Sequence, residues 1–93
     1  MDFGPDAEID HGHMVPPYRQ LASILRARIA RGDYRPGRAI PSEARLVQEF
    51  GLARDTVRKA VRLLADDGLV IIVPQRGVFV AEHPSHGKGD RSE

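Results

Sequence analysis

Two short amphipathic segments lie close together in residues 42–68, which read SEARLVQEFGLARDTVRKAVRLLADDG. We expect the first to form a helix that starts at Ser42, whose hydroxyl can cap free N–H groups, and ends at Gly51. After a turn at residues 51–53, the second segment carries apolar residues at helical spacing, at Val57, Ala60, Val61 and Leu64. It should stop at Gly68 in a left-handed cap. Two helices joined by so short a turn form a helix-turn-helix.

The flanking segments extend this pattern to a complete small fold. Upstream, residues 17–31 have one apolar helical face, and residues 38–40 are expected to form a short extended segment. Downstream, the apolar runs 69–73 and 78–81 flank a tight turn at residues 74–77, which predicts a β-hairpin. The expected fold is therefore mainly α with a small β-hairpin, a winged helix-turn-helix of three helices plus a wing.

Charge is distributed unevenly along the 93 residues. Residues 15–81 hold twelve Lys and Arg against six Asp and Glu, a net charge of +6, whereas residues 1–14 carry −4 and residues 82–93 carry −1. A basic domain is typical of proteins that bind polyanions. We therefore expect one basic domain over residues 15–81 between two disordered tails, of which the first is acidic.

Composition excludes several classes of protein. The chain has no cysteine, which excludes a disulfide framework and a thiolate zinc site, and no apolar run long enough for secretion or membrane spanning. We expect a cytoplasmic protein. Residues 15–81 lack histidine, so a general base poised near neutral pH is missing, and we expect neither an enzyme nor a cofactor. The histidine pairs at 11 and 13 and at 83 and 86 are interpreted as solvated tail residues, not as metal ligands.

The outer face of the helix after the turn carries the most informative side chains. Arg54, Arg58 and Arg62 follow one another at four-residue intervals, with Lys59 beside them. Like charges at this spacing destabilise a helix by about 0.2–0.5 kcal/mol per pair. The row of arginines would therefore not stabilise a helix whose outer face only contacts water. DNA would bind it favourably, and we predict that this helix enters the major groove. Asp55 either accepts a hydrogen bond from a cytosine or restrains Arg58 and Lys59 within the helix; the second reading is favoured.

Five stretches of the chain carry recognisable motifs: YRQL at 18–21, GDYRPG at 32–37, IPSE at 40–43, FGLARDTVR at 50–58 and DGLV at 67–70. Over about residues 17–81 the chain resembles the amino-terminal domain of GntR-type (gluconate-repressor-like) bacterial transcription regulators. The resemblance implies a transcription regulator, usually a repressor, that binds specific sequences of double-stranded DNA at the nucleoid in the bacterial cytoplasm.

The resemblance also implies residue roles. Arg54 and Arg58 would reach guanine edges and phosphates, and Thr56 and Asp55 would lie at the groove floor or the DNA backbone. Arg76 with Gly77 would enter the adjacent minor groove. Ala53 departs from the family, which has Ser or Thr there, and forfeits an N-cap hydrogen bond of about 0.5–2 kcal/mol. The complete predicted DNA-contact set is Ser42, Arg45, Arg54, Asp55, Thr56, Arg58, Lys59, Arg62, Gln75, Arg76 and Gly77.

Members of the family normally continue into a carboxy-terminal domain that binds an effector and dimerises, whereas this chain stops at Glu93. We read the chain as either a stand-alone DNA-binding protein or a fragment, in both cases without an effector-binding domain. Three helices and a hairpin should enclose no ligand-sized cavity.

The residues from Val70 to Val73 form an unbroken apolar run, although a strand with one face in water should alternate. Either the strand is buried on both faces, or Ile71 and Val73 contribute to a homodimer contact. A dimer would require a palindromic operator. The alternative function is a winged helix that binds another protein, in which the arginines meet acidic partners.

Overall fold

The three predicted helices are present in the computed structural model, which describes residues 3–82. The helices are α1 (Pro17–Arg31), α2 (Glu43–Phe50) and α3 (Arg54–Asp66). The left-handed cap expected after α3 is confirmed at Gly68, whose φ is 80°. There the N–H of Leu69 donates to the carbonyl of Leu64 at 3.0 Å, which satisfies a carbonyl at the helix end and turns the chain into the hairpin.

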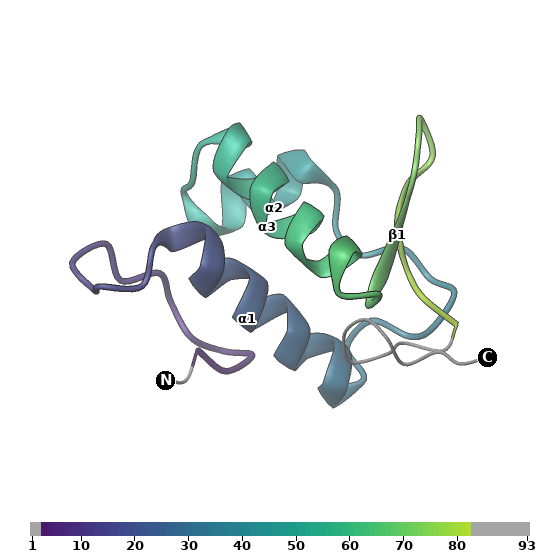
Figure 1. Ribbon diagram of the computed structural model, residues 1–93, viewed down its shortest axis with the longest axis horizontal. Coiled ribbons are helices and arrows are strands. Elements are labelled where there is room, and N and C mark those ends of the chain that lie inside the picture. Colours follow the sequence, from purple (N-terminus) through teal and green to yellow (C-terminus); the bar gives the residue numbers. More distant parts are fainter. Residues whose placement is uncertain (1–2, 83–93) are drawn as a thin grey trace.

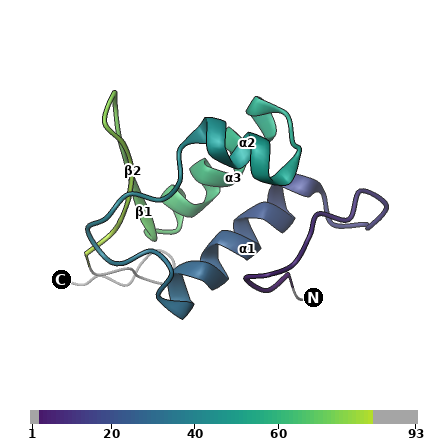
Figure 2. The same cartoon turned by 180° about the vertical axis from the view of Figure 1, so that it is seen from behind.

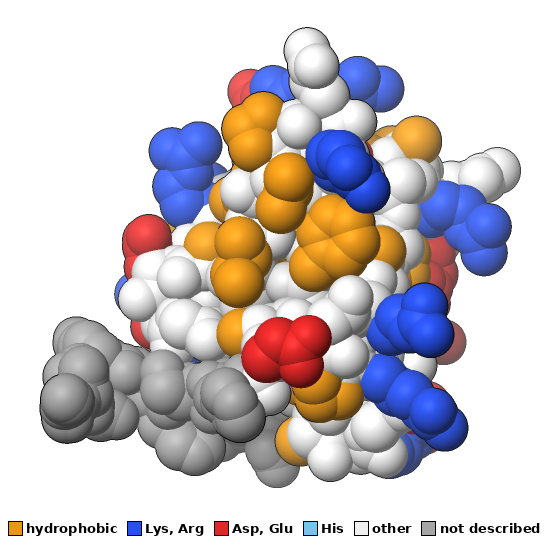
Figure 3. Space-filling view, turned by 90° about the vertical axis from the view of Figure 1, so that its right-hand side faces the viewer, with side chains coloured by type: hydrophobic (Ala, Val, Ile, Leu, Met, Phe, Trp, Pro, Cys, Tyr) orange, Lys and Arg blue, Asp and Glu red, His pale blue; other side chains and the backbone are white. Residues whose placement is uncertain are grey.

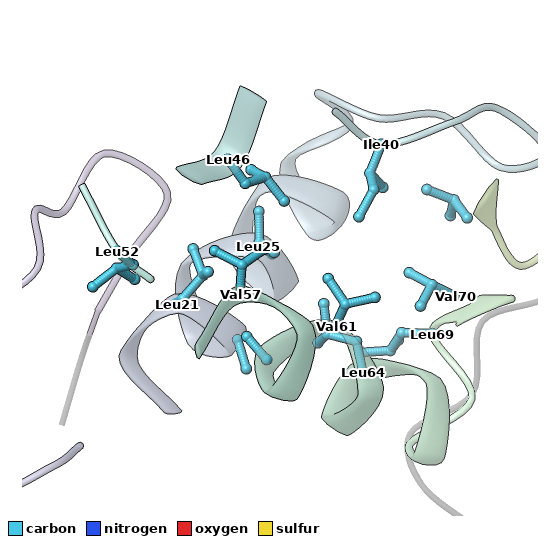
Figure 4. Packing of buried hydrophobic residues seen from close by; sticks show 13 residues of the cluster. Leu21, Leu25, Ile40, Leu46, Leu52, Val57, Val61, Leu64, Leu69 and Val70 are labelled. Carbon is cyan, nitrogen blue, oxygen red and sulfur yellow. The ribbon is translucent and has the colours of Figure 1, made fainter. Parts of the chain in front are cut away.

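The helix α3 packs against both other helices, so its apolar stripe forms the centre of the core (Figures 1 and 4). Burying a side chain of this size is worth about 1.5–3 kcal/mol, and the core therefore fixes which face of α3 points outward. The stripe is Val57, Ala60, Val61 and Leu64, and it meets Leu21 and Leu25 of α1, Leu46 of α2, and Ile40, Leu69, Val70 and Val80 at the base of the hairpin.

The predicted hairpin is also present, and the extended step at residues 38–40 borders it. The strands β1 (Val70–Val73) and β2 (Gly77–Val80) pair in antiparallel fashion. Ala39 bridges to Phe79, and the N–H of Ile40 donates to the carbonyl of Val78 at 2.9 Å. The tip of the hairpin projects away from the helices as a wing (Figure 1).

The apolar run of β1 is not buried on both faces. Val70 is buried, but Ile71 is 53% and Ile72 46% exposed. The register pairs Ile71 with Phe79 and Ile72 with Val78, so the two isoleucines point to opposite faces of the hairpin. The run shows no alternation because both faces of the projecting wing carry apolar side chains.

Residues 3–15, here called the N-terminal arm, run beside α1 (Figures 1 and 2). Composition predicts disorder for residues 1–14, and in the structure side chains of α1 bond to the described part of that segment. The completely buried side chain of Gln20 accepts from the N–H of Asp10 at 2.8 Å and donates to the carbonyls of Asp10 and Val15 at 2.9 and 2.7 Å. These partners are backbone groups, which a pattern of side-chain polarity does not report.

Charged side chains hold the other end of the arm. Arg31 pairs with Asp6 at 3.0 Å and with Asp33 at 2.6 Å, and Arg28 donates to the carbonyl of Pro5 at 2.9 Å. The hydrogen bond from Arg31 holds the pKa of Asp6 below its ordinary value. The Asp6 carboxylate of the arm thus lies at the basic end of α1.

The predicted tail at residues 82–93, with His83 and His86, lies outside the described residues except for Glu82. Within residues 3–82 no helix is both long and apolar enough to cross a membrane. In the same range, no three His, Asp or Glu side chains gather closely enough to hold a metal ion.

Candidate nucleic-acid interface

The arginine row lies on the solvent-facing side of α3, opposite the core. The side chains of Arg54 and Arg58 are 62% and 59% exposed, and Arg62 is exposed as well. Asp55 is almost fully exposed, and its carboxylate lies 4.0 Å from Nη1 of Arg58. An ion pair this open to water is strongly screened by solvent, so Asp55 restrains Arg58 only weakly.

A stronger restraint on the row comes from Glu43, at the first position of α2. Its Oε2 lies 2.6 Å from Nε of Arg58, and its Oε1 lies 3.6 Å from Nε of Arg54. The hydrogen bond from Arg58 to this carboxylate raises the pKa of the guanidinium. One carboxylate thus orients two guanidinium groups and offsets their repulsion. Sequence reasoning missed this role of Glu43, and the Pro-Ser-Glu stretch at residues 41–43 was the available signal.

The predicted contacts at the starts of α2 and α3 have different local environments. The hydroxyl of Ser42 accepts from the N–H of Arg45 at 3.1 Å, which confirms the predicted cap, while the Arg45 side chain is exposed. Thr56 is half-buried in the first turn of α3. Ala53 occupies the N-cap position of α3 without a side-chain hydrogen bond, as its residue type requires.

Lys59 connects the exposed face of α3 to the start of α1. Its Nζ lies 4.7 Å from the centre of the Tyr18 ring, a cation–π arrangement, and the guanidinium of Arg19 lies 5.9 Å from the same ring. The basic surface of α3 therefore continues onto α1, an extension that the helix-turn-helix spacing alone did not indicate.

The tip of the wing carries the remaining predicted contacts. Gln75 adopts a φ of 68°, which is rare outside glycine, and Arg76 and Gly77 follow it at the exposed turn. Arg76 and Gly77 line a groove of about 460 Å³ together with Arg58 and Arg62 of α3. The fold thus brings the wing and α3 together around one concave surface.

This groove has the volume of a ligand site, although it is not an enclosed cavity. Small-molecule sites have volumes of about 300–1,000 Å³, and the groove falls in that range. The space exists because the wing stands beside α3 and does not fold down onto it (Figure 1). The groove is an open concavity between elements, which counting helices and strands does not predict.

Comparison with known proteins identifies the family. Residues 17–80 match the family described as "Bacterial regulatory proteins, gntR family". The chain belongs to the GntR family. The resemblance inferred from the motifs is therefore confirmed, and so is the expectation that the chain is not an enzyme, because this family consists of regulators.

Two curated relatives of this GntR-family chain are repressors by name. The mannosyl-D-glycerate transport/metabolism system repressor MngR of Escherichia coli K12 is 44% identical over 71 residues, which cover 76% of this chain and 29% of the relative. The histidine utilization repressor of Klebsiella aerogenes is 42% identical over 68 residues, covering 73% of this chain and 28% of the relative. The chain thus spans less than a third of the length of these relatives.

A structure with the same fold has been solved in complex with an operator. The AraR DNA-binding domain in complex with operator ORR3 is similar with a TM-score of 0.72 and 39% identity, covering 74% of this GntR-family chain and 83% of that one. The predicted winged helix-turn-helix fold is confirmed, and the GntR-family domain described here is of the DNA-binding type.

Proposed function

We propose that this chain binds specific sequences of duplex DNA and represses transcription. The observation that carries the proposal is the convergence of Arg58, Arg62 and Arg76 on one concave surface, although Arg76 comes from a different element. A convex duplex with phosphates on both sides of its groove fits such a surface. The names of the relatives, which are repressors, support repression, and the operator complex of AraR supports duplex DNA as the partner.

In the proposed complex α3 enters the major groove and the wing approaches the adjacent minor groove. Arg54 and Arg58 bind guanine edges or phosphates, since a guanidinium can bond to guanine O6 and N7 together. Thr56, Asp55, Lys59 and Arg62 lie at the groove wall or backbone, Ser42 and Arg45 at a neighbouring phosphate, and Gln75, Arg76 and Gly77 at the minor groove. The chain would act at the nucleoid of a bacterial cytoplasm.

Selection of bound duplexes from a random library tests specific binding directly. Arg58→Ala should weaken binding to the selected site by about 1–3 kcal/mol and relax the preference at one position, whereas Arg76→Ala should weaken all duplexes nearly equally. Arg26→Ala is the matched control, because Arg26 lies on α1 and pairs with Asp67. Equal, sequence-independent losses from all three variants would refute the proposed roles.

A salt titration separates this function from the binding of an acidic protein. When a protein binds DNA through several phosphates, its affinity falls by orders of magnitude from low to moderate salt. The slope of log affinity against log salt concentration is set by the number of phosphate contacts. A selected duplex should also be preferred over random duplexes at every salt concentration. Weak binding with no footprint on any duplex would favour a protein partner instead.

We further propose that two copies bind a palindromic operator through the outer face of the wing. Ile71, Val73 and Phe79 lie on that face by the strand register, and Ile71 is 53% exposed. Hydrophobic side chains gather there, with Lys and Arg around them (Figure 3). Sedimentation should show two chains per selected duplex, and Ile71→Gln should reduce this to one. A monomer on DNA that contains two half-sites would exclude the contact.

A further inference from the structure

The groove between α3 and the wing has an apolar floor. Ile72 and Val78 form a cross-strand pair on the groove side of the hairpin, and Val61 lines the groove from α3. Ile72 keeps 46% of its surface exposed there, although the residue is strongly hydrophobic.

The rim of the same groove is positively charged. Arg58, Arg62 and Arg76 line it, and Glu43 is the one acidic lining residue in the described part of the chain. The Glu43 carboxylate is already engaged by Arg58 and Arg54. The salt bridges within residues 3–82 leave Arg62 and Arg76 without a carboxylate partner. An anion placed at that rim would therefore meet two guanidinium groups.

We propose that this groove binds a small organic anion with an apolar body, of the chemistry of a medium-chain alkyl carboxylate. The carboxylate lies at Arg62 and Arg76, and the alkyl chain covers Val61, Ile72 and Val78. A nucleic acid backbone matches the rim but offers the apolar floor little, since its surface is polar along its length. An alkyl carboxylate matches both parts of the groove, because apolar pockets with a few polar groups at one end orient such molecules.

The same ligand would exclude DNA, because it occupies Arg62 and Arg76, which belong to the proposed DNA contacts; this second step rests on the proposed function. A DNA-binding domain of this kind would then respond to a metabolite directly at its DNA-binding surface. The binding step itself does not depend on DNA and is measured without it.

The test uses the full chain and three probes. Octanoate carries charge and an alkyl chain, acetate carries charge alone, and octan-1-ol carries the chain alone. Methyl NMR signals of Ile72 and Val78 should shift saturably with octanoate, and the other two probes should bind at least about tenfold more weakly. Ile72→Gln should weaken octanoate binding about tenfold, since it removes apolar contact area.

The matched control is Ile71→Gln, the same change one residue earlier and on the opposite face of the hairpin. It should leave the affinity for octanoate unchanged. Equal losses in the two variants, shifts that never saturate, or a pentaglutamate peptide binding as well as octanoate would overturn the proposal. Concentration-dependent changes at Ile72 without any probe would assign the groove to a second copy and would overturn it too.

Competition between octanoate and duplex DNA tests the second step of the proposal. Octanoate should raise the apparent Kd for a selected duplex, and Ile72→Gln should abolish this increase. Octanoate binding with unchanged DNA affinity would refute the exclusion of DNA. Duplex binding without octanoate binding would overturn this inference alone, whereas octanoate binding with no duplex binding would refute only the proposed function.

Discussion

Replacing Gln20 with alanine should release the N-terminal arm and destabilise the domain. The Gln20 amide is completely buried and makes three hydrogen bonds, to the N–H and carbonyl of Asp10 and to the carbonyl of Val15. Each such bond is worth about 1 kcal/mol after exchange with water, so the variant should lose about 3 kcal/mol of unfolding free energy. For a domain of this size, that corresponds to a decrease in Tm of about 12–24 °C.

Urea unfolding followed by circular dichroism measures this loss. Gln48→Ala is the matched control, since it removes the same side chain from an exposed position on α2 and should change stability by less than about 0.5 kcal/mol. Hydrogen exchange at the Asp10 amide should be slow in the parent chain and fast in Gln20→Ala. Equal stabilities for the two variants, or an Asp10 amide that exchanges freely in the parent chain, would show that Gln20 does not hold the arm.

Three further predictions concern charge and capping. Glu43→Gln should strengthen binding to random duplexes about fivefold, because it removes a negative charge beside two arginines. It should also lower the ratio of the affinity for the selected duplex to the affinity for random duplexes. Filter binding measures both affinities, and an unchanged ratio would show that Glu43 does not position the arginines. Ala53→Ser should raise the unfolding free energy by about 0.5–2 kcal/mol through a new N-cap bond, and Ser42→Ala should lower it by a similar amount; denaturation curves in which both variants match the parent would contradict the capping argument. Asp6 should titrate by NMR below the ordinary aspartate pKa, because Arg31 donates to its carboxylate. Its pair with Arg31 is therefore complete above the ordinary pKa and is lost as the pH falls through the lowered pKa, and Arg31→Gln should raise the midpoint toward the ordinary value.

Sequence reasoning located the elements and the arginine row because both depend on residues close together in the chain. Arg54, Arg58 and Arg62 share a helix face through the four-residue spacing alone, and Gly68 ends α3 because glycine accepts a positive φ. Roles that depend on contacts between residues far apart in the sequence were missed. Glu43 reaches Arg58 across fifteen positions, and the contact exists only because α2 packs against α3.

The amino-acid sequence alone therefore determined the order of helices and strands, the family, and which face of α3 is basic, since periodicity, turn chemistry and motifs are local properties. The tertiary structure was needed for three features: the arm held by Gln20, the carboxylate shared by two arginines, and the groove that joins the wing to α3. Each of these results from how packed elements bring distant residues together, and that geometry follows from the core as a whole and not from any one segment.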